Sequence, residues 1–364
     1  MLLEKLRSFI SAEESVDQTP KAGILCPYTV EEIVHAAGFL PVRIIPERLS
    51  FDIADAYLPT NTCSFLRHVV EMGVRGDLKD MECIIVNHSC DAARRVYDLL
   101  TTYMQRPRIY FQDIPKKCDV DSRVYFTHIL RGLQLFLQNV AGMEITKESL
   151  QASIKVYNRN RKLLCELYSL RAARPDILNS ALMMQVIAEN SKNPKLLMNK
   201  VIASIISEVR GMGTGGETGI TGKRVYVSGG LIDPLPLISY IEEAGGVVVG
   251  DDFCFGGRYC EIDVDEDEAP IDALAKRYLE RIPCGRMERS TERFRYIIEK
   301  MNQFRAGGLI YVSLKFCDNF LVDYHLFKKI LDTEGIPSLF LEGEYSATGS
   351  GQLRTRIEGF VEML

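Results

Sequence analysis

Short runs of apolar and β-branched residues alternate with helical segments, and this alternation restricts the possible folds most strongly. Between about residues 20 and 125 there are four such runs: Gly23-Ile-Leu-Cys26, Leu40-Pro-Val-Arg-Ile-Ile45, Cys83-Ile-Ile-Val-Asn87 and Arg108-Ile-Tyr-Phe111. Runs without a polar face are typical of parallel strands buried on both sides. Because helical segments separate them, we predict a parallel sheet covered by helices on both faces.

The first helix of this segment carries a start signal. Thr29 stands where an N-cap residue is expected, and Glu32 follows three residues later, as in a capping box. Gly38 is a natural stop. We therefore predict a helix over residues 29–37 with Thr29 as its N-cap.

The same alternation returns in the last third of the chain. Its strand-like runs are Arg224-Val-Tyr-Val-Ser228, Val247-Val-Val-Gly250, Gly308-Leu-Ile-Tyr-Val312 and Pro337-Ser-Leu-Phe-Leu341. Between about residues 122 and 210, apolar residues recur every three or four positions and predict helices, and a glycine-rich stretch over 211–219 marks a boundary. The prediction is an α/β protein with two Rossmann-like parallel-sheet domains, 1–125 and 216–364, and a helical linking domain, 126–215.

Composition and charge exclude several classes of protein. Of the 364 residues, 46% are hydrophobic and 26% are charged, as in ordinary globular proteins, and the net charge of −5 provides no basic field for nucleic acid or an anionic membrane. No run approaches the roughly 20 apolar residues of a membrane helix. The amphipathic N-terminus lacks the apolar core of a signal peptide, so we expect a cytoplasmic protein.

The ten cysteines of the chain require an explanation. Disulfides are not expected in a reducing cytoplasm, which leaves buried apolar thiols, metal ligands or catalytic thiols. No Cys-x-x-Cys pair is present, and this argues against a zinc ribbon or a ferredoxin-type cluster loop. A metal site would have to be assembled from distant segments.

Four cysteines, Cys63, Cys90, Cys254 and Cys317, stand in predicted loops between a strand and the following helix. In parallel α/β sheets ligands bind beyond the carboxyl ends of the strands, and helix N-termini stabilise thiolates. The pattern leaves two alternatives: simple packing at strand ends, or a cysteine-bound cluster in a cleft between the two α/β domains.

The other six cysteines do not stand in such loops or carry weaker signals. Cys83 lies in a predicted strand and Cys165 in a predicted helix, so we expect both to be buried apolar thiols. The pattern does not decide between packing and a functional role for Cys26, Cys118, Cys260 and Cys284. Arg67 and Arg258 are candidates for binding an anion such as a phosphate, but a surface salt bridge is the expected role of each.

Several segments resemble the 2-hydroxyacyl-CoA dehydratase and benzoyl-CoA reductase family, and specifically a 2-hydroxyglutaryl-CoA dehydratase D-component. They are Leu58-Pro-Thr-Asn-Thr-Cys63, Asn87-His-Ser-Cys90-Asp91, Gly250-Asp-Asp-Phe-Cys254-Phe-Gly-Gly-Arg-Tyr259, Lys315-Phe-Cys317-Asp318 and the C-terminal residues 351–364. The resemblance runs in order from about residue 20 to the end of the chain.

The resemblance implies a particular chemistry. Members of the family form dimers in which each protomer holds a [4Fe–4S] cluster through three cysteines. An ATP-dependent iron–sulfur activator delivers one electron, which reaches the thioester carbonyl of an (R)-2-hydroxyacyl-CoA. A ketyl radical forms, the 2-hydroxyl leaves and an enoyl-CoA results.

Carried over to this sequence, the resemblance implies that Cys63, Cys90 and Cys317 are the metal ligands. Cys254 is then a fourth candidate for cofactor binding or a close neighbour of the cluster. Glu47 and His88 are candidate catalytic residues, with a solvated loop carboxylate and ordinary packing as the respective alternatives. Some relatives hold a double-cubane cluster and have an additional Cys-Pro motif. In this sequence the corresponding residue is Cys83, which lies within a predicted strand. This difference favours a single cluster.

Two alternatives to the dehydratase subunit remain open. One is a subunit of a benzoyl-CoA-reductase type or other low-potential reductase. The other is an electron-relay subunit without a substrate site of its own. In each case the expected partners are a second family subunit, in a homo- or heterodimer, and the activator, and an acyl-CoA is the expected substrate of the enzyme.

Overall fold

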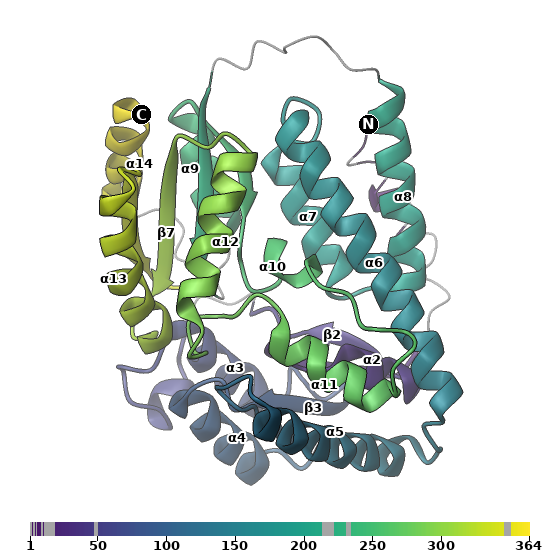
Figure 1. The fold of residues 1–364 in the computed structure, drawn as a ribbon. Coiled ribbons are helices and arrows are strands. Elements are labelled where there is room, and N and C mark those ends of the chain that lie inside the picture. Colours follow the sequence, from purple (N-terminus) through teal and green to yellow (C-terminus); the bar gives the residue numbers. More distant parts are fainter. Residues whose placement is uncertain are drawn as a thin grey trace.

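Two parallel sheets and a helical region between them form the frame of the protein in this computed structural model (Figure 1). The structure describes residues 19–46, 50–212, 222–230, 234–345 and 351–364, together with positions 2, 4, 6–8 and 10 near the N-terminus. The predicted α/β class is confirmed, and both sheets are parallel throughout.

The first sheet has the strand order β2-β1-β3-β4. Its strands are β1 (Lys21–Ile24), β2 (Leu40–Arg43), β3 (Met81–Asn87) and β4 (Arg108–Gln112). The connections contain α2 (Glu31–Ala36), the short 3₁₀ helix η1 (Ala54–Ala56), α3 (Ser64–Arg75) and α4 (Asp91–Tyr103). β1 pairs with both β2 and β3, so the strand order reverses beside β1, and such switch points are where α/β sheets bind ligands.

The second sheet repeats this order as β6-β5-β7-β8. Its strands are β5 (Lys223–Gly229), β6 (Gly246–Asp251), β7 (Gly308–Leu314) and β8 (Ser338–Gly343). The helices of this part are α9 (Pro234–Glu243), α10 (Gly257–Cys260), α11 (Pro270–Glu280), α12 (Ser290–Gln303), α13 (Asp318–Thr333) and α14 (Gly351–Met363). The reversal here lies between β5 and β7.

Four helices lie between the sheets in sequence: α5 (Val120–Ala141), α6 (Lys147–Ala173), α7 (Ser180–Asn190) and α8 (Lys195–Gly211). α6 and α8 pack side by side, and α5 packs against α11 of the C-terminal part (Figure 1). The domain limits 1–125, 126–215 and 216–364 stay predictions. Most of the glycine-rich stretch 211–219 lies outside the described residues.

The capping box predicted for the first helix is wrong. α2 begins at Glu31, and its N-cap residue Val30 makes no side-chain cap. The Thr29 hydroxyl donates instead to the Asn87 side-chain oxygen on β3, at 2.7 Å. Glu32 is buried and accepts hydrogen bonds from Arg161 and Tyr278, so tertiary partners have replaced the local capping interaction.

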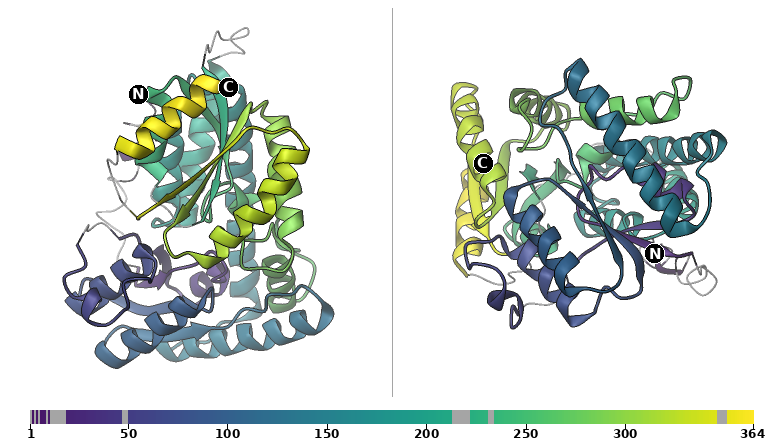
Figure 2. Two further views of the ribbon diagram at one scale, coloured as in Figure 1. Left: turned by 90° about the vertical axis from the view of Figure 1, so that its left-hand side faces the viewer. Right: turned by 90° about the horizontal axis from the view of Figure 1, so that it is seen from below.

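The two α/β parts face each other through the loops that follow their strands. In Figures 1 and 2 the N-terminal part lies against the end of the second sheet toward which β7 points. The Arg281 guanidinium donates to the backbone oxygen of Pro27 at 2.7 Å, and the Tyr345 amide donates to the Ser64 hydroxyl at 2.6 Å. Pro27 follows β1 and Tyr345 follows β8, so segments at the carboxyl ends of both sheets meet.

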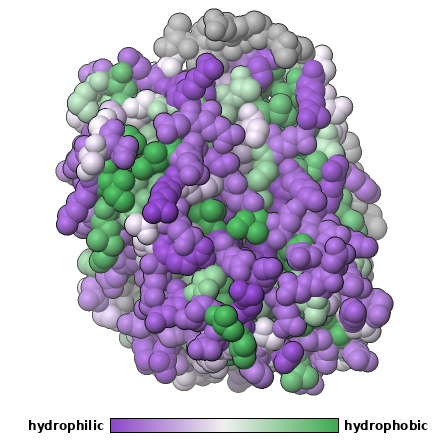
Figure 3. All heavy atoms as spheres, viewed as in Figure 1, coloured by the Kyte–Doolittle hydropathy of each residue, from purple (hydrophilic) through white to green (hydrophobic). Residues whose placement is uncertain are grey.

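None of the helices in the described part of the chain combines the length and apolar character needed to cross a membrane. The face drawn in Figure 3 is mainly hydrophilic, with apolar side chains gathered in smaller areas. The cytoplasmic location stays a prediction.

Candidate metal centre

Three of the four cysteines that follow predicted strands stand directly before a helix. Cys63 is the N-cap residue of α3, Cys90 of α4 and Cys317 of α13. The Cys90 sulfur accepts a hydrogen bond from the Ala93 amide at 3.4 Å. Free amide groups and the positive end of the helix dipole favour negative charge at such positions, so all three sites suit a thiolate.

The structure brings these sulfurs into one neighbourhood. Burial raises the pKa of the Cys63 thiol to about 12, and nearby Cys90 adds to this rise. Burial also raises the pKa of Cys317, and the neighbouring Cys63, Cys90 and Cys254 raise it further. Three segments that are far apart in sequence thus share one electrostatic environment. A thiol buried in this way stays protonated unless a cation takes the place of its proton.

Hydrogen bonds between the two α/β parts hold the cysteine-bearing segments together. The Asn319 side-chain amide, in the first turn of α13, donates to the backbone oxygen of Ser89 at 3.0 Å. Ser64 receives the Tyr345 amide. Cys90 and Cys63 are therefore each one residue away from a contact that crosses between the sheets.

Cys254 lies in the segment after β6 and is buried. Arg258 donates to its sulfur at 3.4 Å and to the backbone oxygen of Gly229 at 3.1 Å. Burial alone would lower the pKa of Arg258, but Cys254 and Asp252 raise it above its usual value. The expectation of a surface salt bridge for Arg258 is wrong, because the guanidinium lies inside the protein and turns toward a sulfur.

A buried ionic network supports this region. Arg293 is completely buried and donates to Asp252 at 2.8 Å, to Ser228 at 2.9 Å and to Asp323. The Tyr311 hydroxyl also donates to Asp323, at 2.6 Å. These contacts link the end of β5, the end of β6 and α13, which are the elements next to Cys254 and Cys317.

Two cysteines that the sequence pattern left undecided also belong to this region. Burial raises the pKa of Cys26 to about 12, and Cys284 and Cys254 contribute to the rise. Cys26 follows β1 at the switch point of the first sheet. Its position after a strand was a usable signal, whereas Cys284 lies in the loop between α11 and α12 and carries no comparable local signal.

The other candidates have different surroundings. His88 Nδ1 lies 2.8 Å from a carboxylate oxygen of Asp113, and its ring packs on Phe111. These contacts support a packing role for His88, which was the alternative to a catalytic one. Glu47 lies outside the described residues. Cys83 is fully buried in β3, as expected. Cys165 is partly exposed and touches Cys260, so the expectation of a buried apolar thiol is wrong for Cys165.

Comparisons with known proteins find relatives that cover nearly the whole chain. The family model "2-hydroxyglutaryl-CoA dehydratase, D-component" matches residues 26–364. The chain is 25% identical to the (R)-phenyllactyl-CoA dehydratase beta subunit of Clostridium sporogenes, over 96% of this chain and 93% of the relative. It is 26% identical to the lactoyl-CoA dehydratase beta subunit of Anaerotignum propionicum, over 94% of this chain and 91% of the relative.

A reductase subunit is similar to a comparable degree. One of the benzoyl-CoA reductase subunits of Thauera aromatica is 26% identical over 90% of this chain and 85% of the relative. The family expected from the motifs is confirmed, and with it the enzyme class, since the family is one of dehydratase subunits. The chain belongs to the 2-hydroxyglutaryl-CoA dehydratase D-component family.

Proposed function

We propose that this chain is the iron–sulfur subunit of a 2-hydroxyacyl-CoA dehydratase that eliminates water from an (R)-2-hydroxyacyl-CoA by a ketyl-radical mechanism. Cys63, Cys90 and Cys317 hold one [4Fe–4S] cluster in this proposal. The observation that carries it is that three cysteines at helix N-cap positions, contributed by both α/β parts, lie in one electrostatic neighbourhood.

The donor set fits such a cluster. Iron–sulfur clusters are held by cysteine thiolates, and helix N-termini supply the amide groups that stabilise charged sulfur. When bound through three cysteines, the cluster supplies a low-potential electron and one open iron site for the oxygen of the substrate. The chain supplies the thiolates, the Ala93 amide next to Cys90, and partial shielding of the site from bulk water, since Cys63 is buried while Cys90 and Cys317 are partly exposed.

Cys254 and Arg258 are assigned a supporting role. Arg258 is held by the backbone oxygens of Gly229 and Pro283, so its charge has a fixed position. A fixed cation beside the cluster would favour its reduced, more negative form. Cys254 remains the fourth candidate ligand, and its hydrogen bond from Arg258 suits a thiolate.

The names of the relatives support an acyl-CoA substrate. The three relatives described above are dehydratase or reductase subunits named after CoA thioesters. Because each of them is named as one subunit among several, we propose that this chain also works with a second subunit, and that an ATP-dependent activator provides the electron. The similarity to a benzoyl-CoA reductase keeps a reductase as the second candidate.

Iron analysis tests the cluster. The chain, purified without oxygen, should contain about four irons and four sulfides and give an EPR signal on reduction. Cys63→Ser, Cys90→Ser and Cys317→Ser should each lose most of the iron, whereas Cys165→Ser should keep it. Full iron content in all three variants would disprove the ligand assignment, and about eight irons would indicate a double-cubane cluster instead.

Turnover tests the reaction. The chain with its partner subunit and activator should convert a 2-hydroxyacyl-CoA to an enoyl-CoA. Reduction of an aromatic acyl-CoA in place of dehydration would favour the reductase alternative. If only the partner subunit bound acyl-CoA, this chain would be the electron relay.

A further inference from the structure

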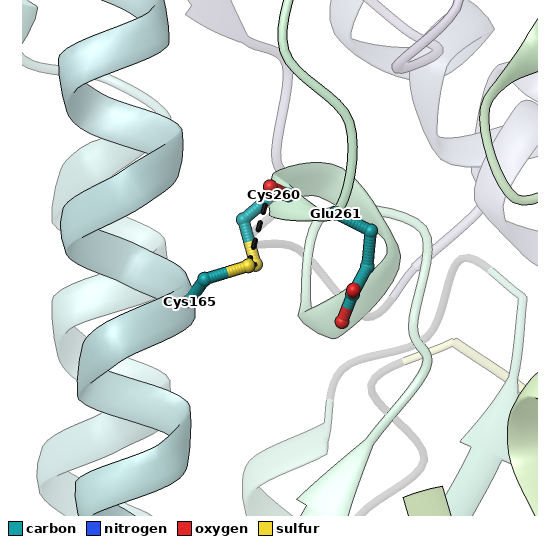
Figure 4. A group of neighbouring side chains, drawn as sticks. All are labelled: Cys165, Cys260 and Glu261. Carbon is teal, nitrogen blue, oxygen red and sulfur yellow. Dashed lines mark hydrogen bonds between the residues drawn. The ribbon is translucent and has the colours of Figure 1, made fainter. Parts of the chain in front are cut away.

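Two cysteines away from the candidate metal centre touch each other. Cys165 Sγ lies 2.9 Å from Cys260 Sγ, and the two sulfurs meet between α6 and α10 (Figure 4). Both residues are free thiols. A disulfide bond is about 2.05 Å long, so the sulfurs need to approach by only about 0.9 Å to form one.

From this contact we propose that Cys165 and Cys260 form a redox-active dithiol, which a small-molecule disulfide such as oxidised glutathione converts to an intramolecular disulfide. Cys165 is partly exposed and Cys260 is buried. Cys165 is therefore the sulfur that an oxidant reaches first, and Cys260 is the one that resolves the mixed disulfide.

The proposed reaction consists of two thiol–disulfide exchanges. The Cys165 thiolate attacks one sulfur of oxidised glutathione, forms a mixed disulfide and releases one glutathione thiolate. The Cys260 thiolate then attacks Cys165 Sγ and releases the second glutathione. The two cysteines lose two electrons, oxidised glutathione gains them, and the two thiol protons pass to the two released glutathiones.

The reduced pair is held by further hydrogen bonds. Cys165 Sγ donates to the backbone oxygen of Cys260 at 3.2 Å, and Cys260 Sγ to the backbone oxygen of Gly257 at 3.3 Å. The contact with the Cys165 thiol and burial together raise the pKa of Cys260 well above its usual value. Cys260 therefore keeps its proton until Cys165 has reacted, which fits the order of the two exchanges.

A metal site is the alternative to a dithiol, because the carboxylate of Glu261 lies within 4.8 Å of both sulfurs. Two observations favour the dithiol. One carboxylate oxygen of Glu261 already accepts from the Tyr296 hydroxyl at 2.8 Å and pairs with Lys300 at 3.0 Å. Two sulfurs at about 2.3 Å from a tetrahedral zinc would stand about 3.8 Å apart, well beyond the observed 2.9 Å.

The disulfide would join the helical region to the segment that carries Cys254. Tyr168, one turn after Cys165 on α6, already donates to Asp251 at 2.9 Å, and Arg171 pairs with the same carboxylate at 3.3 Å. Oxidation would add a covalent link six residues beyond Cys254. The inferred consequence is a stiffer connection between α6 and this segment under oxidising conditions.

Peptide mapping of the full chain tests the proposal. The chain is reduced, freed of reductant without oxygen, incubated with oxidised glutathione, alkylated and digested with trypsin without reduction. Peptides 163–171 and 259–276 contain one cysteine each, so the disulfide appears as one linked pair that lacks two hydrogens and disappears after reduction. Free-thiol counts should fall by two from the ten cysteines of the sequence.

Variants and a metal titration give the decisive controls. Cys165→Ser and Cys260→Ser should each abolish the linked pair, and Cys118→Ser should retain it. The pair should also be lost when oxidation is carried out in urea, because only the fold brings the sulfurs together. Alkylation of both cysteines after oxidation, with no linked pair, would overturn the proposal. Zinc binding that protects both cysteines and is lost in Cys165→Ser would replace it with a metal site.

Discussion

The side chain of Asn319 donates a hydrogen bond of 3.0 Å to the backbone oxygen of Ser89, across a sequence separation of 230 residues. Asn319 lies two residues after Cys317, and Ser89 directly precedes Cys90. One amide group thus ties together two of the three segments that carry the candidate ligands, and it joins the two α/β parts at that point.

Replacing Asn319 with alanine should loosen this connection. Loss of one such hydrogen bond lowers the free energy of unfolding by about 1 kcal/mol, and iron loss from the anaerobic protein should become faster. Urea unfolding and the rate of iron release to a chelator measure the two effects. Gln303→Ala removes a similar amide from an exposed position and should change neither. Wild-type rates in Asn319→Ala would mean that this contact does not position the ligands.

Arg293 should be required for the stability of the C-terminal part. Arg293→Met leaves the buried carboxylate of Asp323 without its cation and leaves Asp252 only the longer ion pair with Arg258, at 3.7 Å. This change costs about 3–5 kcal/mol. Denaturant unfolding followed by circular dichroism measures this loss. Arg295→Met, at an exposed position of the same helix, is the matched control and should stay within about 0.5 kcal/mol of the wild type. Equal stability of the two variants would contradict the role given to the network.

Because of Glu32, the free energy of unfolding should fall as the pH becomes acidic. Burial alone would raise the pKa of Glu32, but Arg161 and Arg277 outweigh it and lower the pKa below its usual value. A carboxyl with a lowered pKa stabilises the fold above its unfolded pKa of about 4.3, and this contribution disappears as the pH falls through the folded pKa.

Glu32→Gln should therefore be less stable than the wild type by about 3 kcal/mol at neutral pH. The difference should shrink as the pH falls below about 4.3. Unfolding curves at several pH values test this, with the exposed Glu82→Gln as control. A difference that stays constant down to acid pH would show that the charge of Glu32 is not the cause.

Gly257 should not accept a side chain. A Cβ atom there would lie 2.2 Å from the backbone oxygen of Asp251, and the backbone cannot move aside cheaply. Gly257→Ala should lower the free energy of unfolding by about 1–3 kcal/mol. Gly211→Ala is a suitable control, because among the residues that the structure describes no packing neighbour lies within 4 Å of its added Cβ. Similar melting temperatures for the two variants would contradict the close packing of the turn around Cys254.

Much of the fold follows from local sequence patterns. The eight buried runs predicted as strands correspond to β1–β8, because apolar and β-branched runs between helices leave few alternatives to buried parallel strands. Helix boundaries are less accurate. The pattern predicts a helix over residues 29–37 with Thr29 as its N-cap, whereas α2 begins at Glu31.

The sequence alone determined the alternation of strands and helices, and it placed Cys63, Cys90, Cys254 and Cys317 after strands. Only the tertiary structure decided which groups meet: Thr29 with Asn87, Arg258 with Cys254, and Cys165 with Cys260. The reason is physical. Periodicity and turn chemistry act over a few residues and can be read locally, whereas the partner of a buried polar group or thiol is set by how segments distant in sequence pack together.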